Sequence, residues 1–158
     1  MRDVQKDIQN ILIKSIDSTP EHLSRFFKTD AGEYAELDKF LGIKTPTLRK
    51  IAKEYKNISL AVIEYFLQSQ FNEERLFALI VLVMQYQEAD IDERENIFQC
   101  YLKNIDHVNN WNLVDNSAHH IVGAHLWNRD RTLLIKLAES KNLWERRVSI
   151  VATCHFIK

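Results

Sequence analysis

Hydrophobic residues recur at three- and four-residue spacing along most of the chain, which is the period of an amphipathic helix. The pattern is clearest after Thr45 and Pro46, where Leu48, Ile51 and Ala52 share one face. A hydroxyl residue followed by proline is a common helix start, because the side chain caps the first turn and proline needs no N–H donor there. We therefore predict a helix that begins at Thr45.

The same signals predict helices in the rest of the chain. Thr19 and Pro20 repeat the start signal, and Ser59 opens a segment at 60–67. Asn72 opens a longer segment whose centre, 76–84, is apolar on all sides, as expected for a helix buried between neighbours. The remaining helices are predicted at 92–103, 110–126, 130–140 and from 143 to the end, with Asp92 and Asp130 as N-caps.

These helices group into consecutive pairs: 59–69 with 72–88, 92–103 with 109–126, and 130–140 with 143–157. The second helices begin at intervals of about 36 residues, which is typical of two-helix solenoid repeats. No segment resembles an interdomain linker, so we expect one domain over residues 1–158. A stack of helix pairs forms a concave groove that suits an extended partner better than a small metabolite.

Composition supports an all-helical globular domain. Of 158 residues, only three are glycine and two proline, too few for the turns of a sandwich or barrel of short strands. Two cysteines, Cys100 and Cys154, cannot form a disulfide framework and indicate a reducing compartment. The first ten residues carry charges where a signal peptide would be apolar, and the longest apolar run has nine residues. We expect a cytoplasmic protein that contacts no membrane.

The charge pattern is more informative than the formal net charge of −1, which by itself speaks against a nucleic-acid partner. Residues 44–56 contain five basic side chains and one acidic one, whereas residues 88–95 contain five acidic side chains and one basic one. Such clusters are usually solvated helix faces. A local basic surface nevertheless remains compatible with binding to phosphates.

The common enzyme signatures are absent: there is no glycine-rich phosphate loop, GxSxG, HExxH or paired CxxC. His119, His120 and His125 lie close together in the sequence, but their spacing does not place all three on one helix face. We expect these histidines to pack in the core or lie at the surface, and we expect no metal site.

One turn of the predicted helix at 110–126 has an unusual composition. Trp111 and Asp115 are four residues apart, so they share a helix face, and the carboxylate lies among apolar residues. A buried carboxylate needs a partner, and Arg147 on the equivalent helix of the next pair is the natural one. The three residues form either a structural Asp–Arg brace beside a packed tryptophan, or an electronegative pocket with an aromatic wall for a cation.

Residues 40–53 read FLGIKTPTLRKIAK and resemble the FxGIxTPxxRxIAK signature of the AlkD-type DNA glycosylases, which are DNA alkylation repair enzymes. Three further stretches are similar to that family in the same order: 72–84, 111–115 in the pattern WxxVD, and 143–150 in the pattern LWxxRxxI. The resemblance implies an all-α fold, a right-handed solenoid of antiparallel helix pairs of the HEAT-like or ARM type.

The resemblance implies a DNA glycosylase of base-excision repair that removes purines alkylated at N3 or N7. Trp111, Asp115 and Arg147 match the family's catalytic residues. An alkylated purine is cationic and leaves readily, so no general acid is needed, unlike glycoside hydrolysis by two carboxylates. Asp115 is expected to stabilise the developing charge on the deoxyribose and orient water. Trp111 would pack against the sugar or base, and Arg147 would hold a backbone phosphate and position the carboxylate.

The implied partner is double-stranded DNA carrying alkylated bases, and family members need no metal or organic cofactor. We expect a monomer. The resemblance implies that the basic stretch at residues 44–56 binds DNA, because backbone N–H groups at a helix N-terminus and the basic residues around it can contact phosphates. The candidate DNA-binding residues are Lys44, Thr45, Arg49, Lys50 and Lys53.

Family chains usually continue through further helix pairs, so we expect this chain, which ends at Lys158, to be truncated at its C-terminus relative to the family. The alternative function is a non-catalytic HEAT-like module that binds DNA or a protein along its concave face. That alternative would be favoured by an Asp115 carboxylate buried behind its neighbours. A third possibility, a structural scaffold, would show no salt-dependent binding of DNA. The sequence does not specify the preferred alkylated base.

Overall fold

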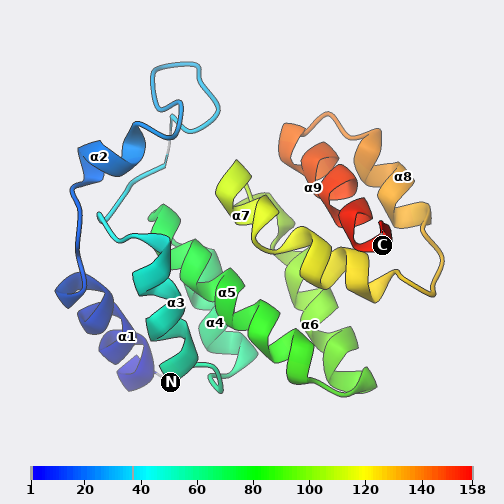
Figure 1. Ribbon diagram of the computed structural model, residues 1–158, viewed down its shortest axis with the longest axis horizontal. Helices are drawn as coiled ribbons and strands as arrows, with labels where there is room; N and C mark the ends of the chain where they lie inside the picture. The colour runs from blue at the N-terminus through cyan, green and yellow to red at the C-terminus, as the bar shows by residue number, and fades with distance from the viewer. Residues whose placement is uncertain (1, 37, 158) are drawn as a thin grey trace. The chain divides into compact units, whose positions relative to one another are not determined.

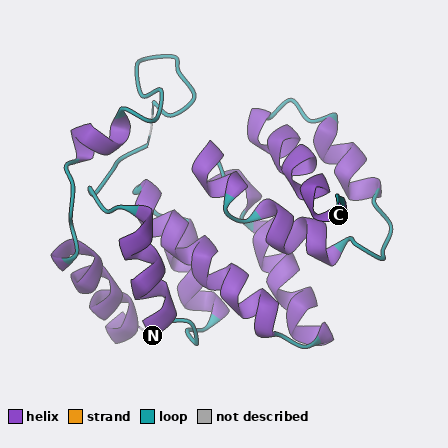
Figure 2. Cartoon of the chain, in the orientation of Figure 1, coloured by secondary structure: helices purple, strands orange, loops and turns teal. Residues whose placement is uncertain are grey.

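The regular elements are helices, as Figures 1 and 2 show for the computed structural model, which describes residues 2–36 and 38–157. Within these ranges the one bridge between extended segments joins Lys39 and Phe71. The all-α prediction is therefore confirmed for the described residues. The chain divides into two compact units, Met1–Val81 and Leu82–Lys158.

The first unit is built from four helices and the beginning of a fifth. These are α1 (Arg2–Lys14), α2 (Pro20–Ser24), α3 (Thr45–Glu54), α4 (Leu60–Leu67) and α5 (Asn72–Glu88), which ends in the second unit. α1 packs against α3. Ile8 and Leu12 of α1, Leu48 of α3 and Phe66 of α4 are fully buried, and the Phe66 ring meets the Phe77 ring edge-on. α1 was not predicted, because it buries only two residues among many charged ones.

The start of α2 is as predicted, whereas the start of α3 differs in detail. The Thr19 hydroxyl oxygen accepts the His22 N–H at 3.1 Å, so Thr19 caps α2. For α3, the predicted cap at Thr45 is wrong: Lys44 occupies the N-cap position and Thr45 is already helical. The Asp17 carboxylate caps this helix from outside, because it accepts the Lys44 N–H at 2.9 Å and the Thr47 hydroxyl at 2.6 Å.

Gly42 explains the close approach of the loop before α3 to the segment after α1. Its φ of 96° lies in the left-handed region, where other residues are strained. A Cβ on Gly42 would lie 2.6 Å from the Ser18 carbonyl oxygen. The Gly42 carbonyl in turn accepts the N–H groups of Asp17 and Ser18 at 3.1 and 2.9 Å. The loop conformation therefore requires glycine at this position.

The second unit is centred on its last long helix. Its elements are α6 (Ile91–Lys103), the 3-10 turn η1 (Ile105–His107), α7 (Trp111–Asp115), the π-helical turn η2 (His119–Gly123), α8 (Thr132–Ala138), α9 (Leu143–Thr153) and the 3-10 turn η3 (Cys154–Phe156). α9 packs against α7, η2 and α8. Val114, Ile121, Val148 and Ala152 are fully buried at these contacts.

The predicted helix at 110–126 is interrupted. α7 ends at Asp115, and the chain resumes as the π-helical turn η2. Gly123 ends that turn against α9, where a Cβ would lie 2.2 Å from the Ala152 carbonyl oxygen. The close contact of η2 with α9 therefore depends on a residue without a side chain.

Two predicted caps in the second unit are corrected. Asp90, not Asp92, is the N-cap of α6, because Asp90 and Glu93 form a reciprocal capping box and Asp92 lies inside the first turn. Arg131 occupies the N-cap position of α8, although the neighbouring Asp130 carboxylate accepts the Thr132 N–H at 2.9 Å. Acidic residues are frequent throughout the first helical turn, so sequence alone placed both caps imprecisely.

Direct packing of α8 against α9 agrees with the last predicted helix pair. The stacking of all pairs into a right-handed solenoid stays a prediction. Among the described residues, no helix has the length and apolar character required to cross a membrane.

Candidate active site

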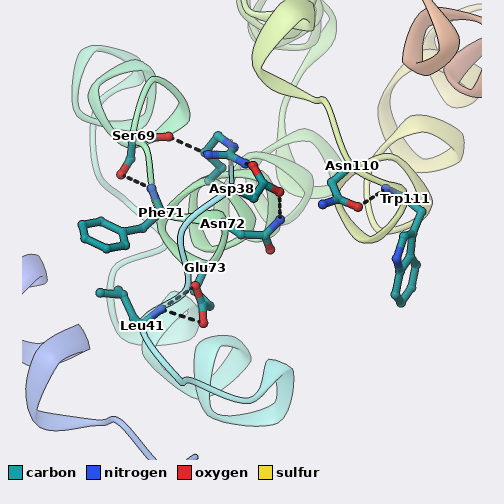
Figure 3. A network of polar contacts seen from close by, with 9 residues as sticks. Asp38, Leu41, Ser69, Phe71, Asn72, Glu73, Asn110 and Trp111 are labelled. Carbon is teal, nitrogen blue, oxygen red and sulfur yellow. Dashed lines mark hydrogen bonds and ion pairs between the residues drawn. The ribbon is translucent and has the colours of Figure 1, made fainter. Parts of the chain in front are cut away.

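α7 is a short helix whose first and last residues are the predicted tryptophan and aspartate. Asn110 is the N-cap of α7 and is fully buried, and its side-chain oxygen accepts the Trp111 N–H at 2.8 Å (Figure 3). Leu113 and Val114 are fully buried and anchor the helix in the core. Trp111 and Asp115 are half-buried on the opposite side, one helical turn apart.

The predicted pairing of Asp115 with Arg147 is confirmed. Arg147, on α9, donates from Nε to Asp115 Oδ1 at 2.9 Å and from Nη2 to Oδ2 at 2.7 Å. Two parallel charge-assisted bonds fix the plane of the carboxylate as well as its position. The Arg147 side chain is 41% exposed and that of Asp115 is 38% exposed. The carboxylate is therefore oriented by α9 and still accessible from solvent.

Two histidines follow Asp115 on the adjoining turn. The rings of His119 and His120 lie against each other with centroids 3.7 Å apart and planes tilted by 39°. Burial lowers the pKa of His119 and nearby His155 lowers it further, while the Asp115 carboxylate acts in the opposite direction. His119 is consequently neutral near pH 7, and Arg147 supplies the positive charge beside Asp115.

The third histidine of the sequence cluster, His125, lies in the core. Its Nδ1 is 3.2 Å from the Tyr86 hydroxyl, its Nε2 is 3.1 Å from Glu95 Oε2, and its ring stacks on Phe98 at 3.9 Å. His125 also contacts Arg129. Of the two expected placements, core or surface, His125 takes the core. Among the described residues, no group of three or more histidine, cysteine or acidic side chains could hold a metal ion.

Sequence reasoning missed an open pocket of about 320 Å³ beside His120. Its lining includes the aromatic rings of Tyr86 and Trp127 and three basic side chains, Arg94, His120 and His155. The residues come from α5, α6, η3 and the segment around η2, which share no sequence motif. No spacing rule could have grouped them before the fold was known.

The candidate DNA-binding residues all lie on or beside α3 in the first unit. Leu48, Ile51 and Ala52 are buried as predicted. The candidate basic residues are exposed, namely Lys44, Arg49, Lys50 and Lys53. Thr45 is half-buried. α3 and its N-cap residue therefore present four cationic side chains to solvent.

Asp17 changes the expected role of the α3 N-terminus, because its carboxylate already occupies part of it. Burial raises the pKa of Asp17, but hydrogen bonds from the Thr47 hydroxyl and the Lys44 N–H outweigh that effect and lower the pKa below its ordinary value of 3.8. The carboxylate is thus ionised at neutral pH and competes with any phosphate for this position. The backbone N–H of Lys44 is therefore bonded to Asp17, whereas the side chains of Lys44, Arg49, Lys50 and Lys53 are exposed to solvent.

Glu73 is a further buried residue that the sequence did not single out. Its carboxylate accepts the backbone N–H groups of residues 41–43, in the loop that leads into α3. Figure 3 shows the bonds to Leu41. The signal in the sequence is weak, because Glu73 looks like an ordinary acidic residue in the first turn of a helix.

Comparison of the chain with protein families gives one match. The sequence model of a family described as DNA alkylation repair enzyme covers residues 12–158, which include all the candidate site residues. Searches of curated proteins and of solved structures found no match.

Proposed function

Because the chain belongs to the DNA alkylation repair enzyme family, we propose that it is a DNA glycosylase that hydrolyses the N-glycosidic bond of purines alkylated at N3 or N7 in duplex DNA. The observation that carries the proposal is the Asp115–Arg147 pair: an oriented, accessible carboxylate one turn from Trp111. The family match supports a role in DNA alkylation repair, and the local chemistry of the pair favours this reaction.

The protein does not need to activate the leaving group, because the alkylated purine already carries a positive charge. When the bond from C1′ to the purine nitrogen breaks, its electron pair leaves with the base and neutralises the base's positive charge. The deoxyribose becomes cationic, and the oxygen of a water molecule bonds to C1′ and releases a proton. The products are a neutral alkylpurine, an abasic site and that proton. No acid needs to protonate the leaving group, in contrast to ordinary glycoside hydrolysis.

Asp115 is the proposed catalytic residue. An ionised carboxylate that is already fixed in place stabilises the sugar cation without reorganising during the reaction. The same carboxylate can accept a hydrogen bond from the attacking water and orient it towards C1′. The accessibility of Asp115, 38% exposed, is compatible with direct contact to a substrate, and it differs from the buried carboxylate that would favour the non-catalytic module.

Trp111 and Arg147 are proposed to complete the site. The electron-rich face of an indole attracts cations, so Trp111 would pack against the cationic sugar or base. Arg147 binds both oxygens of Asp115 and would also contact a backbone phosphate of the DNA, which sets the register of the nucleotide.

We further infer that the exposed basic residues of α3 and its N-cap, namely Lys44, Arg49, Lys50 and Lys53, together with Thr45, contact backbone phosphates of the duplex. Such contacts are independent of base sequence and become weaker as salt concentration rises. We infer that the helix pairs stack as a HEAT-like right-handed solenoid, whose concave face would follow the duplex. No metal or organic cofactor is part of the proposal.

Substrate preference tests the proposed chemistry. Duplexes that contain N7-methylguanine, N3-methyladenine or the neutral lesion uracil are incubated with the protein, and free base and abasic sites are measured. We expect release of the two cationic purines and none of uracil, because the proposed mechanism depends on the positive charge of the leaving base. Binding of all duplexes without release of any base would favour the non-catalytic module, and equal release of uracil would contradict the proposed dependence on a cationic leaving group.

A further inference from the structure

The loop that leads into α3 is attached to the first turn of α5 by a buried carboxylate. Glu73 is 3% exposed. Both of its oxygens accept the Leu41 N–H at 3.0 Å (Figure 3). Oε1 also accepts the N–H groups of Gly42 at 2.9 Å and Ile43 at 3.3 Å. Three consecutive backbone N–H groups thus converge on one anionic group, in the arrangement known as a nest.

The preceding residues of the same segment are held by the same helical turn. The Asn72 side chain donates to Asp38 Oδ2 at 3.0 Å, and the Arg75 guanidinium pairs with Asp38 Oδ1. The Lys39 carbonyl accepts the Asn72 N–H at 2.8 Å. The first turn of α5 therefore forms hydrogen bonds with Asp38, with Lys39 and with residues 41–43.

This attachment determines where α3 begins. Ile43 is buried, and Lys44, the N-cap of α3, follows it directly. Gly42 has the positive φ that the turn requires and leaves no room for a side chain against Ser18. A buried carboxylate is costly unless it is fully hydrogen-bonded, and charge-assisted bonds of this kind favour one geometry over alternatives. These bonds therefore favour one conformation of the loop.

We propose that Glu73 is a positioning residue for DNA binding. By fixing residues 41–43 it orients α3, so that the exposed basic residues of that helix are preorganised for backbone phosphates. Preorganised groups lose less conformational freedom on binding, so binding is tighter for the same contacts. This inference rests on the proposed role of α3 in DNA binding, and it adds a residue that itself never touches DNA.

The test compares Glu73→Gln with Glu74→Gln. Both substitutions neutralise a buried carboxylate in the same helical turn, but Glu74 accepts from the Ser69 hydroxyl and makes no bond to residues 41–43. The affinity for an unmodified duplex of about 20 base pairs is measured across a salt series. For Glu73→Gln we expect about 3- to 10-fold weaker binding and a salt slope smaller by about one. For Glu74→Gln we expect both quantities at the level of the unsubstituted protein.

The salt slope separates positioning from a loss of folded protein, because an inactive fraction lowers the apparent affinity without changing the slope. Amide hydrogen exchange gives a second measurement: Glu73→Gln should lose protection at residues 41–43 and keep it in α5. If Glu73→Gln does not fold, Glu73→Asp, which keeps the charge on a shorter side chain, is measured in the same way with the same expectation.

Equal slopes for the unsubstituted protein and the Glu73 variant would overturn the positioning role, as would an equal loss in the Glu74 variant. Both results would leave the proposed glycosylase function intact. Absence of any salt-dependent duplex binding by the unsubstituted protein is a different result, and it would overturn the proposed function together with the inference that rests on it.

Discussion

Arg147 and Asp115 meet through two parallel hydrogen bonds, a geometry that depends on the planar guanidinium group. This contact was predictable, because Trp111 and Asp115 share a helical turn and Arg147 lies on the equivalent helix of the next predicted pair. The contacts of Glu73 were not predictable, because no spacing rule links a side chain to the backbone N–H groups of a distant loop. Contacts between side chains on regular helices follow from sequence more readily than contacts to loop backbone.

Replacing Arg147 with lysine tests whether the orientation of Asp115 matters. Lysine keeps the positive charge but cannot form the two-bond fork. For Arg147→Lys we expect the single-turnover rate of base release to fall by about 10- to 100-fold, while duplex affinity changes by less than about threefold.

The matched control is Arg146→Lys, since Arg146 is the neighbouring residue and donates instead to the Ser140 carbonyl at 2.8 Å. A full rate in Arg147→Lys would show that charge alone suffices at this position. An affinity loss as large as the rate loss would assign Arg147 to binding instead of positioning.

At the scale of elements, helices with a clear apolar face were predicted well and their ends less well. α3, α4, α5 and α6 lie where the periodicity placed them. The interruption after α7 had no sequence signal that the periodicity could detect, because apolar residues continue through η2. Gly123, at the end of η2, packs so closely against α9 that a side chain there would meet the Ala152 carbonyl oxygen. Tertiary packing, which a local pattern does not describe, decides such details.

His125 links three elements, and its protonation should control the stability of the second unit. Burial lowers its pKa from the ordinary 6.5 and Arg129 lowers it further, while Glu95 acts in the opposite direction. The unfolded chain therefore binds more protons than the folded chain below about pH 7. The stabilisation that neutral, buried His125 provides is fully present above pH 6.5, the pKa of the unfolded state. It is lost as the pH falls through 6.5 and then through the lower pKa of His125 in the folded state.

We accordingly expect the free energy of unfolding to decrease between pH 7 and pH 5, with a slope of at most about 1.4 kcal/mol per pH unit for each proton taken up. Urea titrations at several pH values measure this slope. In His125→Gln the slope should become smaller, with a remainder from His119, whose pKa is shifted in the same direction. An unchanged slope in this variant would exclude His125 as the titrating group.

For the whole molecule, the distribution of charge matters more than its sum. A net charge of −1 argues against a nucleic-acid partner, yet α3 and its N-cap residue expose four basic side chains along one short segment. The family match over residues 12–158 agrees with the resemblance found in the motifs. Composition predicted the helical class, the motifs predicted the family and the candidate site, and neither predicted the buried polar contacts that fix loop geometry.

The central claim is that the Asp115 carboxylate accelerates cleavage of the N-glycosidic bond. The most direct measurement is the single-turnover rate of N7-methylguanine release by Asp115→Asn, with Asp106→Asn, an exposed aspartate of the same unit, as the control. We predict a rate about 10²- to 10³-fold lower for Asp115→Asn and an unchanged rate for the control. A rate for Asp115→Asn within about twofold of the unsubstituted protein, with the fold intact, would contradict the account.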